Sequence, residues 1–453
     1  MENVNNRVCK CPYCFKKFVP AAVAFRAETV YMEQDLEDMS PEEAEAKKAF
    51  LEAEDPVYEE FWKKYPGSRP DNDEYARHPV IWNSEIPGQG GKMTYLKGTY
   101  STDSDGFINE VVDSEGAHSK IRICPHCHNR LPFAFGKYPV KYIAVVGITS
   151  SGKTVYLSQV LRQIKGIFSR AGMTIVGTHA EVDEFVEEYK VEKGRPLPTG
   201  NATHILTPPL PLNVRNSQNM THTLVFYDIA GENCVVPEQM EKYGAFIKNA
   251  DGIIMIVDPR QFHELFHIGG YLRGESMAVQ PETVIEAMYN TFVAESAGGK
   301  SNIPIAVAIS KSDLLRSQVN PDMNFLHDID YRAYGGYGFP AEDFNRMNVE
   351  IHNLLMPENN SMQGKIFMDS LNECFSTRAM FAFSALNVAA TVRTGEDDRA
   401  YSVIEEDPET VRVEDPIFWI LYQLHIIPEI HKKAAAVSER DTKPPKKLFG
   451  RRK

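Results

Sequence analysis

The chain has 453 residues, of which 43% are hydrophobic and 25% are charged, a composition typical of a soluble globular protein. This length exceeds what one hydrophobic core supports, so we expect two or three structural units. The sequence has no apolar run near the length of a membrane span and no apolar signal core at its start, which predicts a cytoplasmic protein without a membrane span. Its net charge of −13 argues against general affinity for nucleic acid.

Two segments of opposite charge lie behind this average. Residues 28–74 contain 16 acidic and 5 basic residues, a net charge of −11. Residues 431–453 contain 9 basic and 2 acidic residues, a net charge of +7, and are too polar and proline-rich to pack, so we expect a disordered basic tail. Such a tail could contact anionic lipid, RNA or the acidic segment, but a solvated tail is the simpler interpretation.

Four of the seven cysteines form two C-P-x-C turns, at residues 11–14 and 124–127. Each turn points two thiolates the same way, so the pair of turns predicts a tetrahedral Zn²⁺ site of the zinc-ribbon type. The predicted ligands are Cys11, Cys14, Cys124 and Cys127. Cys9 could replace Cys11, and we expect His126 and His128 to be solvated or to lie outside the ligand set. In a cytosolic chain a metal site is favoured over disulfides or a redox pair.

The two turns are unusually far apart. Zinc ribbons commonly separate them by roughly 15–20 residues, whereas here residues 15–123 intervene. We interpret residues 1–136 as a ribbon that carries an acidic insertion over residues 15–123, with the ends of the insertion held together by the metal. Within it, Ser40 to Glu43 form a capping box that begins a helix, and residues 93–101 and 106–113 form a hairpin.

Residues 147–154 fit the phosphate-loop pattern G-x-x-x-x-G-K-[ST]. A strand over 140–146 leads in and a helix over 155–168 leads out, so the loop amides and the helix dipole form a cradle for phosphates. Lys153 would reach the outer phosphates, and the Thr154 hydroxyl would bind Mg²⁺. The predicted phosphate-binding residues are Gly147, Thr149, Ser150, Ser151, Gly152, Lys153 and Thr154.

Further apolar strands alternate with helical stretches along residues 137–430, as in a parallel sheet with crossover helices. This pattern predicts an α/β P-loop domain whose mostly parallel sheet is flanked by helices. The predicted strands cover residues 222–227, 251–257, 303–309 and 380–383.

Three motifs follow these strands: Asp228-x-x-Gly231, Ser310-Lys311-Ser312-Asp313 and Ser384-Ala385-Leu386. Together with the phosphate loop they resemble the motifs of P-loop GTPases of the translation-factor-like class. The resemblance implies that Asp228 binds Mg²⁺ through water and that Gly231 contacts the γ-phosphate. It also implies that Asp313 accepts two hydrogen bonds from guanine, that Lys311 lies over the ring, and that residues 384–386 contact the guanine oxygen. If the last two motifs were coincidental, the chain would be a P-loop ATPase.

With the ribbon upstream, the chain resembles bacterial zinc-ribbon proteins with double-GTPase domains of conflict systems. It departs from small GTPases where Glu232 replaces the glutamine that orients the attacking water. We therefore expect slow or partner-dependent hydrolysis that involves Lys153, Gly231 and Glu232. Thr149 would crowd an arginine finger from a partner, and Arg195 could serve in cis, although a solvated arginine is favoured.

The first switch requires a threonine that completes the Mg²⁺ shell. Thr203 and Thr207 both fit, and the sequence does not separate them. Our interpretation is a GTP switch with a zinc ribbon that contacts a protein partner. Two alternatives remain open: a GTP-binding scaffold that does not hydrolyse, and a nucleic-acid-binding ribbon protein.

Overall fold

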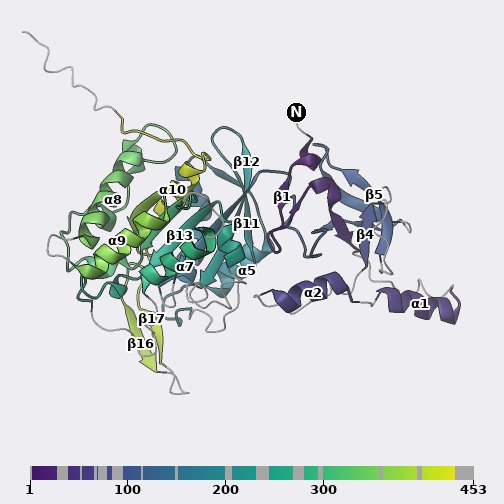
Figure 1. Ribbon diagram of the computed structural model, residues 1–453, viewed down its shortest axis with the longest axis horizontal. Coiled ribbons are helices and arrows are strands. Elements are labelled where there is room, and N and C mark those ends of the chain that lie inside the picture. The colour runs from purple at the N-terminus through teal and green to yellow at the C-terminus, as the bar shows by residue number, and fades with distance from the viewer. Residues whose placement is uncertain are drawn as a thin grey trace, which may run out of the picture.

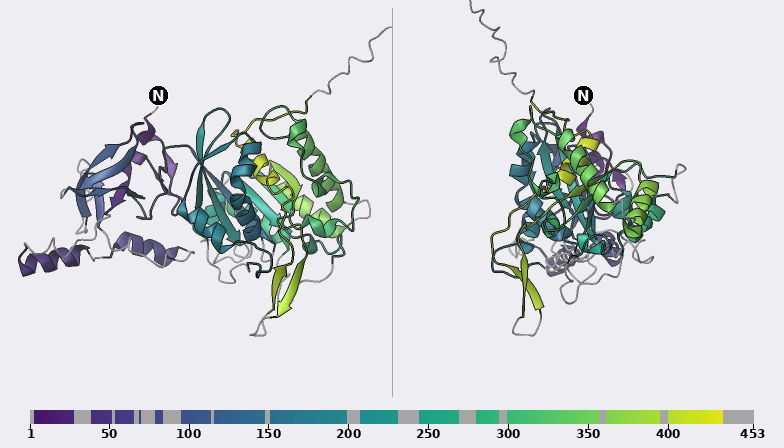
Figure 2. Two further views of the ribbon diagram at one scale, coloured as in Figure 1. Left: turned by 180° about the vertical axis from the view of Figure 1, so that it is seen from behind. Right: turned by 90° about the vertical axis from the view of Figure 1, so that its left-hand side faces the viewer.

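In the computed structural model, the described residues form two larger neighbouring sheets, of seven and six strands, with their helices and two small two-stranded sheets (Figure 1). The described residues are 3–27, 39–51, 54–65, 69, 79–83, 95–113, 116–147, 151–198, 207–230, 244–268, 280–293, 299–356, 361–394 and 400–433. In the left view of Figure 2 the N-terminal sheet lies beside the larger one, and in both views a two-stranded hairpin projects from the larger part.

The larger sheet has seven strands in the order β10-β11-β12-β9-β13-β14-β15. The strands are β9 (Val140–Gly147), β10 (Thr174–Thr178), β11 (Leu210–Arg215), β12 (Thr221–Ala230), β13 (Gly252–Val257), β14 (Ile305–Ile309) and β15 (Arg378–Ala382). The five from β12 to β15 run parallel, while β10 and β11 are antiparallel and form one edge. This is the predicted mixed α/β architecture of a P-loop domain.

Burial explains why the sequences of the central strands are continuously apolar. Every residue of β13 and of β14 is buried, and so are residues 142–147 of β9. A strand that is covered on both faces must be apolar at every position, as parallel strands of α/β proteins are.

Helices flank this sheet. They are α3 (Lys153–Arg162), α4 (Ile164–Arg170), α5 (Ala180–Glu188), α7 (Pro281–Val293), α8 (Ala341–Leu355), α9 (Met362–Cys374) and α10 (Asp415–Gln423). The helix expected over 155–168 is divided into α3 and α4 at Gln163, whose ψ of 7° leaves the helical range. α10 closes the domain against β13, and a Cβ on Gly252 would lie only 2.6 Å from Ile420 Cγ2.

Short 3₁₀ turns connect several of these elements. They are η1 (Val4–Asn6), η2 (Pro20–Ala22), η6 (Pro259–Gln261), η7 (Ser312–Leu315), η8 (Asn324–Leu326) and η9 (Tyr331–Ala333). Over the described residues, no helix combines the length and apolarity that crossing a membrane requires.

The smaller sheet has six strands in the order β7-β6-β5-β4-β3-β8. They are β3 (Ala24–Arg26), β4 (Val80–Asn83), β5 (Tyr95–Thr102), β6 (Ile108–Asp113), β7 (His118–Ser119) and β8 (Ile121–Ile123). The predicted hairpin is present as β5 and β6. We expected the metal to hold the ends of the insertion together, but β3 and β8 also pair directly, with Ala24 opposite Ile123.

Two helices precede β4. α1 (Pro41–Leu51) begins at the predicted capping box, in which Ser40 N donates to Glu43 Oε2 (3.0 Å) and Glu43 N donates to Ser40 Oγ (3.3 Å). α2 (Pro56–Lys64) is capped by Asp55, whose Oδ1 accepts from the amides of Val57 and Tyr58.

Asp55 also fixes α2 to the rest of the N-terminal region. Its Oδ2 lies 2.7 Å from Arg26 Nη1 and 2.7 Å from His128 Nδ1, and all three side chains are buried. Burial alone would raise the pKa of Asp55, but His128 and Arg26 outweigh it and hold the pKa at about 2. One carboxylate therefore joins α2, β3 and the second cysteine turn.

We expect Asp55→Ala to lower the free energy of unfolding of the N-terminal region by about 3–5 kcal/mol, because the substitution leaves the buried Arg26 guanidinium without its counter-charge. Urea denaturation followed by the fluorescence of Trp62 and Trp82 measures the loss. Since the folded pKa is depressed, this stabilisation is complete above about pH 4 and disappears as pH falls toward 2.

Asp330→Ala is the matched control, because it removes an exposed ion pair with Arg332 and should leave the transition in place. Equal unfolding midpoints for Asp55→Ala and the wild-type protein would contradict this account of the cluster.

Candidate nucleotide site and metal centre

The phosphate loop begins where β9 ends and stops where α3 begins. Gly147 must be glycine, because a Cβ there would lie 2.6 Å from Ser151 Oγ and 2.8 Å from Ile256 O. Gly152 has a φ of 88°, which favours glycine, and directly precedes Lys153 at the start of α3. Ser151 is fully buried. Thr149 and Ser150 lie outside the described residues.

The two predicted magnesium-binding side chains lie together. Thr154 Oγ1 donates to Asp228 Oδ2 at 2.6 Å, which joins the second residue of α3 to the end region of β12. Asp228 is buried, and its Oδ1 has no hydrogen-bond partner within the described part of the chain. A buried carboxylate oxygen without a partner, beside a threonine hydroxyl, fits a hard cation that takes oxygen ligands.

Of the two threonine candidates for the first switch, the structure describes only Thr207. Thr207 Oγ1 lies 3.5 Å from the carbonyl oxygen of Asp228, so Thr207 is next to the residues just described. Thr203 is outside the described residues, as are Gly231 and Glu232 of the second switch.

The predicted base-reading motif is joined to the phosphate loop by one hydroxyl. Ser310 Oγ donates to the carbonyl oxygen of Ser151 at 2.7 Å, and Ser310 is buried. The motif continues into η7, where Asp313 Oδ1 accepts from Ser384 Oγ at 2.5 Å. Ser384 Oγ in turn accepts from Asn387 N at 2.8 Å. The phosphate loop, the Asp313 motif and the 384–386 loop are therefore joined in one hydrogen-bonded group at the carboxyl ends of β9, β14 and β15.

Ala385 and Leu386 complete the third motif. Ala385 is buried, and the Leu386 carbonyl oxygen accepts from Glu409 N at 2.9 Å. Ser384 N and Val411 N each donate to the other's carbonyl oxygen. These backbone bonds hold residues 384–386 against the returning chain.

A hairpin that the sequence analysis missed emerges directly after this loop. β16 (Ala390–Thr394) pairs with β17 (Ala400–Ile404), and Figure 1 shows the hairpin projecting from the domain. The loop before the first switch joins β17, because Gly194 N donates to Ile404 O (2.9 Å) and Leu197 N donates to Ser402 O (2.7 Å). The hairpin therefore connects the 384–386 loop to residues 194–197, which precede the predicted first switch.

Arg195 lies in this same loop. Its side chain is 70% exposed and pairs with Glu192 at 2.7 Å, as expected for a solvated arginine.

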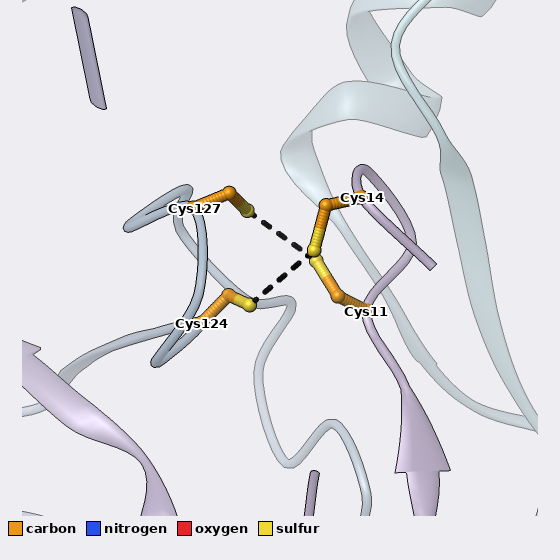
Figure 3. Close-up of side chains that lie close together, drawn as sticks. All are labelled: Cys11, Cys14, Cys124 and Cys127. Carbon is orange, nitrogen blue, oxygen red and sulfur yellow. Dashed lines mark hydrogen bonds between the residues drawn. The ribbon is translucent and has the colours of Figure 1, made fainter. Parts of the chain in front are cut away.

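The four predicted zinc ligands lie together in Figure 3, with their sulfur atoms within 4.8 Å of one another. The Sγ–Sγ distances are 3.6 Å for Cys11–Cys127 and 3.8 Å for Cys14–Cys124. A tetrahedral Zn²⁺ with bonds of about 2.3 Å requires sulfur separations of about 3.8 Å. Cys9 is not in this group and instead contacts the carbonyl oxygen of Phe18. The cluster fits a zinc ribbon.

The two turns have matching geometry. In the first, Tyr13 N donates to Cys11 Sγ at 3.4 Å; in the second, His126 N donates to Cys124 Sγ at 3.4 Å. Each turn ends on a residue with a φ of 55°, Phe15 and His128. As expected, neither His126 nor His128 is in the cysteine group: His126 is exposed and His128 bonds Asp55.

A bound cation would change the ionisation of this cluster. Burial raises the pKa values of the Cys11 and Cys127 thiols, whereas hydrogen bonds from the other thiols lower that of Cys14. Without a positive ion, only part of the cluster would be ionised, because like charges at this spacing repel one another. Bound Zn²⁺ would stabilise all four thiolates.

The first cysteine turn packs against the larger sheet. Tyr142 Oη donates to Lys10 O (2.6 Å), and Tyr227 Oη donates to Pro12 O (2.8 Å). The Phe15 ring lies 4.9 Å from that of Phe246, centroid to centroid, and 5.9 Å from that of Tyr227. Tyr227 directly precedes Asp228, so the ribbon contacts the strand that presents this carboxylate.

Comparison with known proteins agrees with this geometry. Residues 141–363 match the model of the family described as Double-GTPase 2. The match supports a double-GTPase P-loop domain over these residues. The match covers β9 to the start of α9, which includes the phosphate loop, Asp228 and Asp313. It supports the binding of GTP by this domain.

One similar curated protein comes from Mycolicibacterium smegmatis and is named "Putative ESX-1 scaffolding and assembly protein SaeC". It is 26% identical over 212 residues, which cover 44% of this chain and 52% of the relative. The chain therefore spans about half the length of the curated relative it matches.

We expect Cys14→Ser to lose bound zinc and Cys9→Ser to keep it. Cys14 is one of the four clustered cysteines, whereas Cys9 is not. Zinc content per chain, measured by plasma mass spectrometry after purification, should be close to one for the wild-type protein and Cys9→Ser. Full zinc content in Cys14→Ser would contradict the assignment, as would zinc loss in Cys9→Ser alone.

Proposed function

We propose that the chain is a GTP-binding molecular switch with slow or partner-dependent hydrolysis and with the zinc ribbon as its interaction module. The bond from Ser310 Oγ to the carbonyl oxygen of Ser151 carries this proposal, because it couples a base-reading motif to a phosphate loop. The Double-GTPase 2 match over 141–363 supports it independently.

Guanine selectivity would come from Asp313. A carboxylate accepts hydrogen bonds only, and guanine offers two neighbouring donors at N1 and its exocyclic amine, whereas adenine does not offer that pair. Ser384 holds one oxygen of Asp313 in place at 2.5 Å. The nucleotide would be held by Gly147, Thr149, Ser150, Ser151, Gly152, Lys153, Thr154, Ser310, Lys311, Asp313, Ser384, Ala385 and Leu386.

Mg²⁺ would be held by Thr154, by Asp228 through water, and by a threonine of the first switch. Thr207, which lies beside Asp228, is the better-supported candidate, with Thr203 as the alternative. When bound, the ion would neutralise charge on the phosphates. Lys153 would contact the outer phosphates, and the Gly231 amide would contact the γ-phosphate.

The ribbon is the part that would report the nucleotide state to a partner. Its first turn accepts a hydrogen bond from Tyr227, next to Asp228, and its Phe15 ring packs edge-to-face against Phe246, in the helical residues 244–248 that follow the predicted second switch. A change of the second switch on hydrolysis would therefore alter what the ribbon packs against.

A scaffold that binds GTP without turnover is the second candidate. The name of the M. smegmatis relative describes a scaffolding and assembly protein, which favours an interaction role for this chain as well. Multiple-turnover release of phosphate separates the two, since a scaffold of this kind would release none.

Asp313→Asn should change the preferred base from guanine to xanthine, because the asparagine amide can donate to the xanthine 2-oxygen while its carbonyl still accepts from N1–H. Calorimetric titration with non-hydrolysable GTP, XTP and ATP, each with Mg²⁺, measures the preference. We expect GTP affinity to fall at least about tenfold and XTP affinity to rise.

Asp322→Asn, an exposed exchange in the connection after η7, is the matched control and should bind like the wild-type protein. Equal binding of GTP and ATP by the wild-type protein would contradict the proposed function.

We expect Glu232→Gln to raise multiple-turnover GTP hydrolysis at least about tenfold, since the neutral amide orients water without repelling the γ-phosphate. Phosphate release at saturating GTP is the measurement, with the exposed Glu406→Gln as control. Fast hydrolysis by the wild-type protein would overturn the expectation of slow turnover.

A further inference from the structure

A second aspartate lies at the carboxyl edge of the sheet, and none of the nucleotide-binding motifs contains it. Asp258 directly follows β13, the strand that lies between β9 and β14. Its side chain is 3% exposed. Gly147, at the start of the phosphate loop, pairs with Ile256 of the same strand. Asp258 is therefore close to the nucleotide site and cannot be explained as a solvated surface charge.

Asp258 contacts the lysine of the base-reading motif. Lys311 Nζ lies 2.7 Å from Asp258 Oδ2. Lys311 has a φ of 52°, a left-handed conformation that is uncommon for a residue with a long side chain. A Cβ built on Gly152 would lie 3.9 Å from Lys311 Cε, so the lysine stem passes over the phosphate loop.

A buried arginine, Arg260, forms an ion pair with the same carboxylate. Arg260 Nη2 lies 2.6 Å from Asp258 Oδ2, and Arg260 Nε lies 3.0 Å from Oδ1. Burial alone would raise the pKa of Asp258, but the bonds to Arg260 and the charge of Lys311 outweigh it and leave the pKa below its usual value. Asp258 thus remains an anion that can hold the Lys311 ammonium in one place.

Fixing this lysine has a physical consequence. A free lysine side chain loses rotamer entropy when it is ordered, and a lysine already held by an ion pair avoids much of that cost on ligand binding. We propose that Asp258 is a positioning residue for the guanine nucleotide, which holds the Lys311 stem where it covers the base. The inference rests on the proposed function, since it assumes that residues 310–313 read guanine.

A purely structural role for Asp258 makes a different prediction. Asp258 also caps η6, since its Oδ1 accepts from Arg260 N at 2.9 Å and its own amide donates to Gln261 Oε1. If Asp258 acted only through this cap, its loss would affect nucleotide binding equally with and without the Lys311 side chain. Asparagine is also a good capping residue, so Asp258→Asn removes the charge and retains the cap.

The test is a double-mutant cycle in the full-length, zinc-loaded chain with Asp258→Asn, Lys311→Ala and both together. Dissociation constants are measured by calorimetry with Mg²⁺ and non-hydrolysable GTP, with ATP as comparison. We expect Asp258→Asn to weaken GTP binding about tenfold in the wild-type background and less than about twofold in the Lys311→Ala background. Asp251→Asn is the matched control, because Asp251 pairs with Lys141 just before the same strand begins, and it should bind GTP normally.

A second measurement needs no nucleotide. The rate of reductive methylation of Lys311, followed by mass spectrometry, should rise in Asp258→Asn because its ammonium has lost this partner, while Asp251→Asn should leave it unchanged. Unaltered reactivity, or equal losses of GTP affinity in both backgrounds, would overturn the positioning role. If the wild-type protein shows no preference for GTP over ATP, the proposed function itself fails, which is a different outcome from a wild-type preference that Asp258→Asn does not weaken.

Discussion

The parallel pairing of β9 with β12 on one side and β13 on the other is the constraint on which the nucleotide site depends. It places Ala230 and Ile256 beside Gly147, so the ends of three strands meet at one edge of the sheet. Parallel strands present their carboxyl ends at the same edge, where loops of different origin can converge. The phosphate loop, Asp228 and Asp258 converge there because each lies at the carboxyl end of one of these strands. Ser310 adds the loop after β14 to the group.

The ribbon depends on the same strands from a different direction. The hydroxyls of Tyr142 on β9 and Tyr227 on β12 donate to carbonyl oxygens next to Cys11. Those carbonyls are oriented by the cysteine turn, and the turn is held by its thiolates when metal is bound. Bound metal and bound nucleotide would therefore both contact β9 and β12, which under the proposed function gives a physical route for coupling between them.

Most of the features that could be predicted from the sequence are local patterns of neighbouring residues. The strand before the phosphate loop is apolar because it is buried on both faces, and the cysteine turns stand out by their spacing alone. No sequence pattern predicts the pairing of Gly194 and Leu197 with β17, because it is made by backbone groups that every residue other than proline has. The ion pair between Asp258 and Lys311 joins residues far apart in sequence, and the sequence analysis did not predict it. The divided helix at Gln163 likewise follows from local backbone geometry rather than from apolar periodicity.

Hydrogen–deuterium exchange of the zinc-loaded chain, with and without non-hydrolysable GTP and Mg²⁺, tests the central claim most directly. If the three motifs form one guanine-nucleotide site coupled to the ribbon, GTP should protect residues 147–154, 310–313 and 384–386 together, and should also change exchange at residues 10–15. Protection confined to residues 147–154, with the other two motifs unchanged, would contradict the account, because the nucleotide would then be held by its phosphates alone.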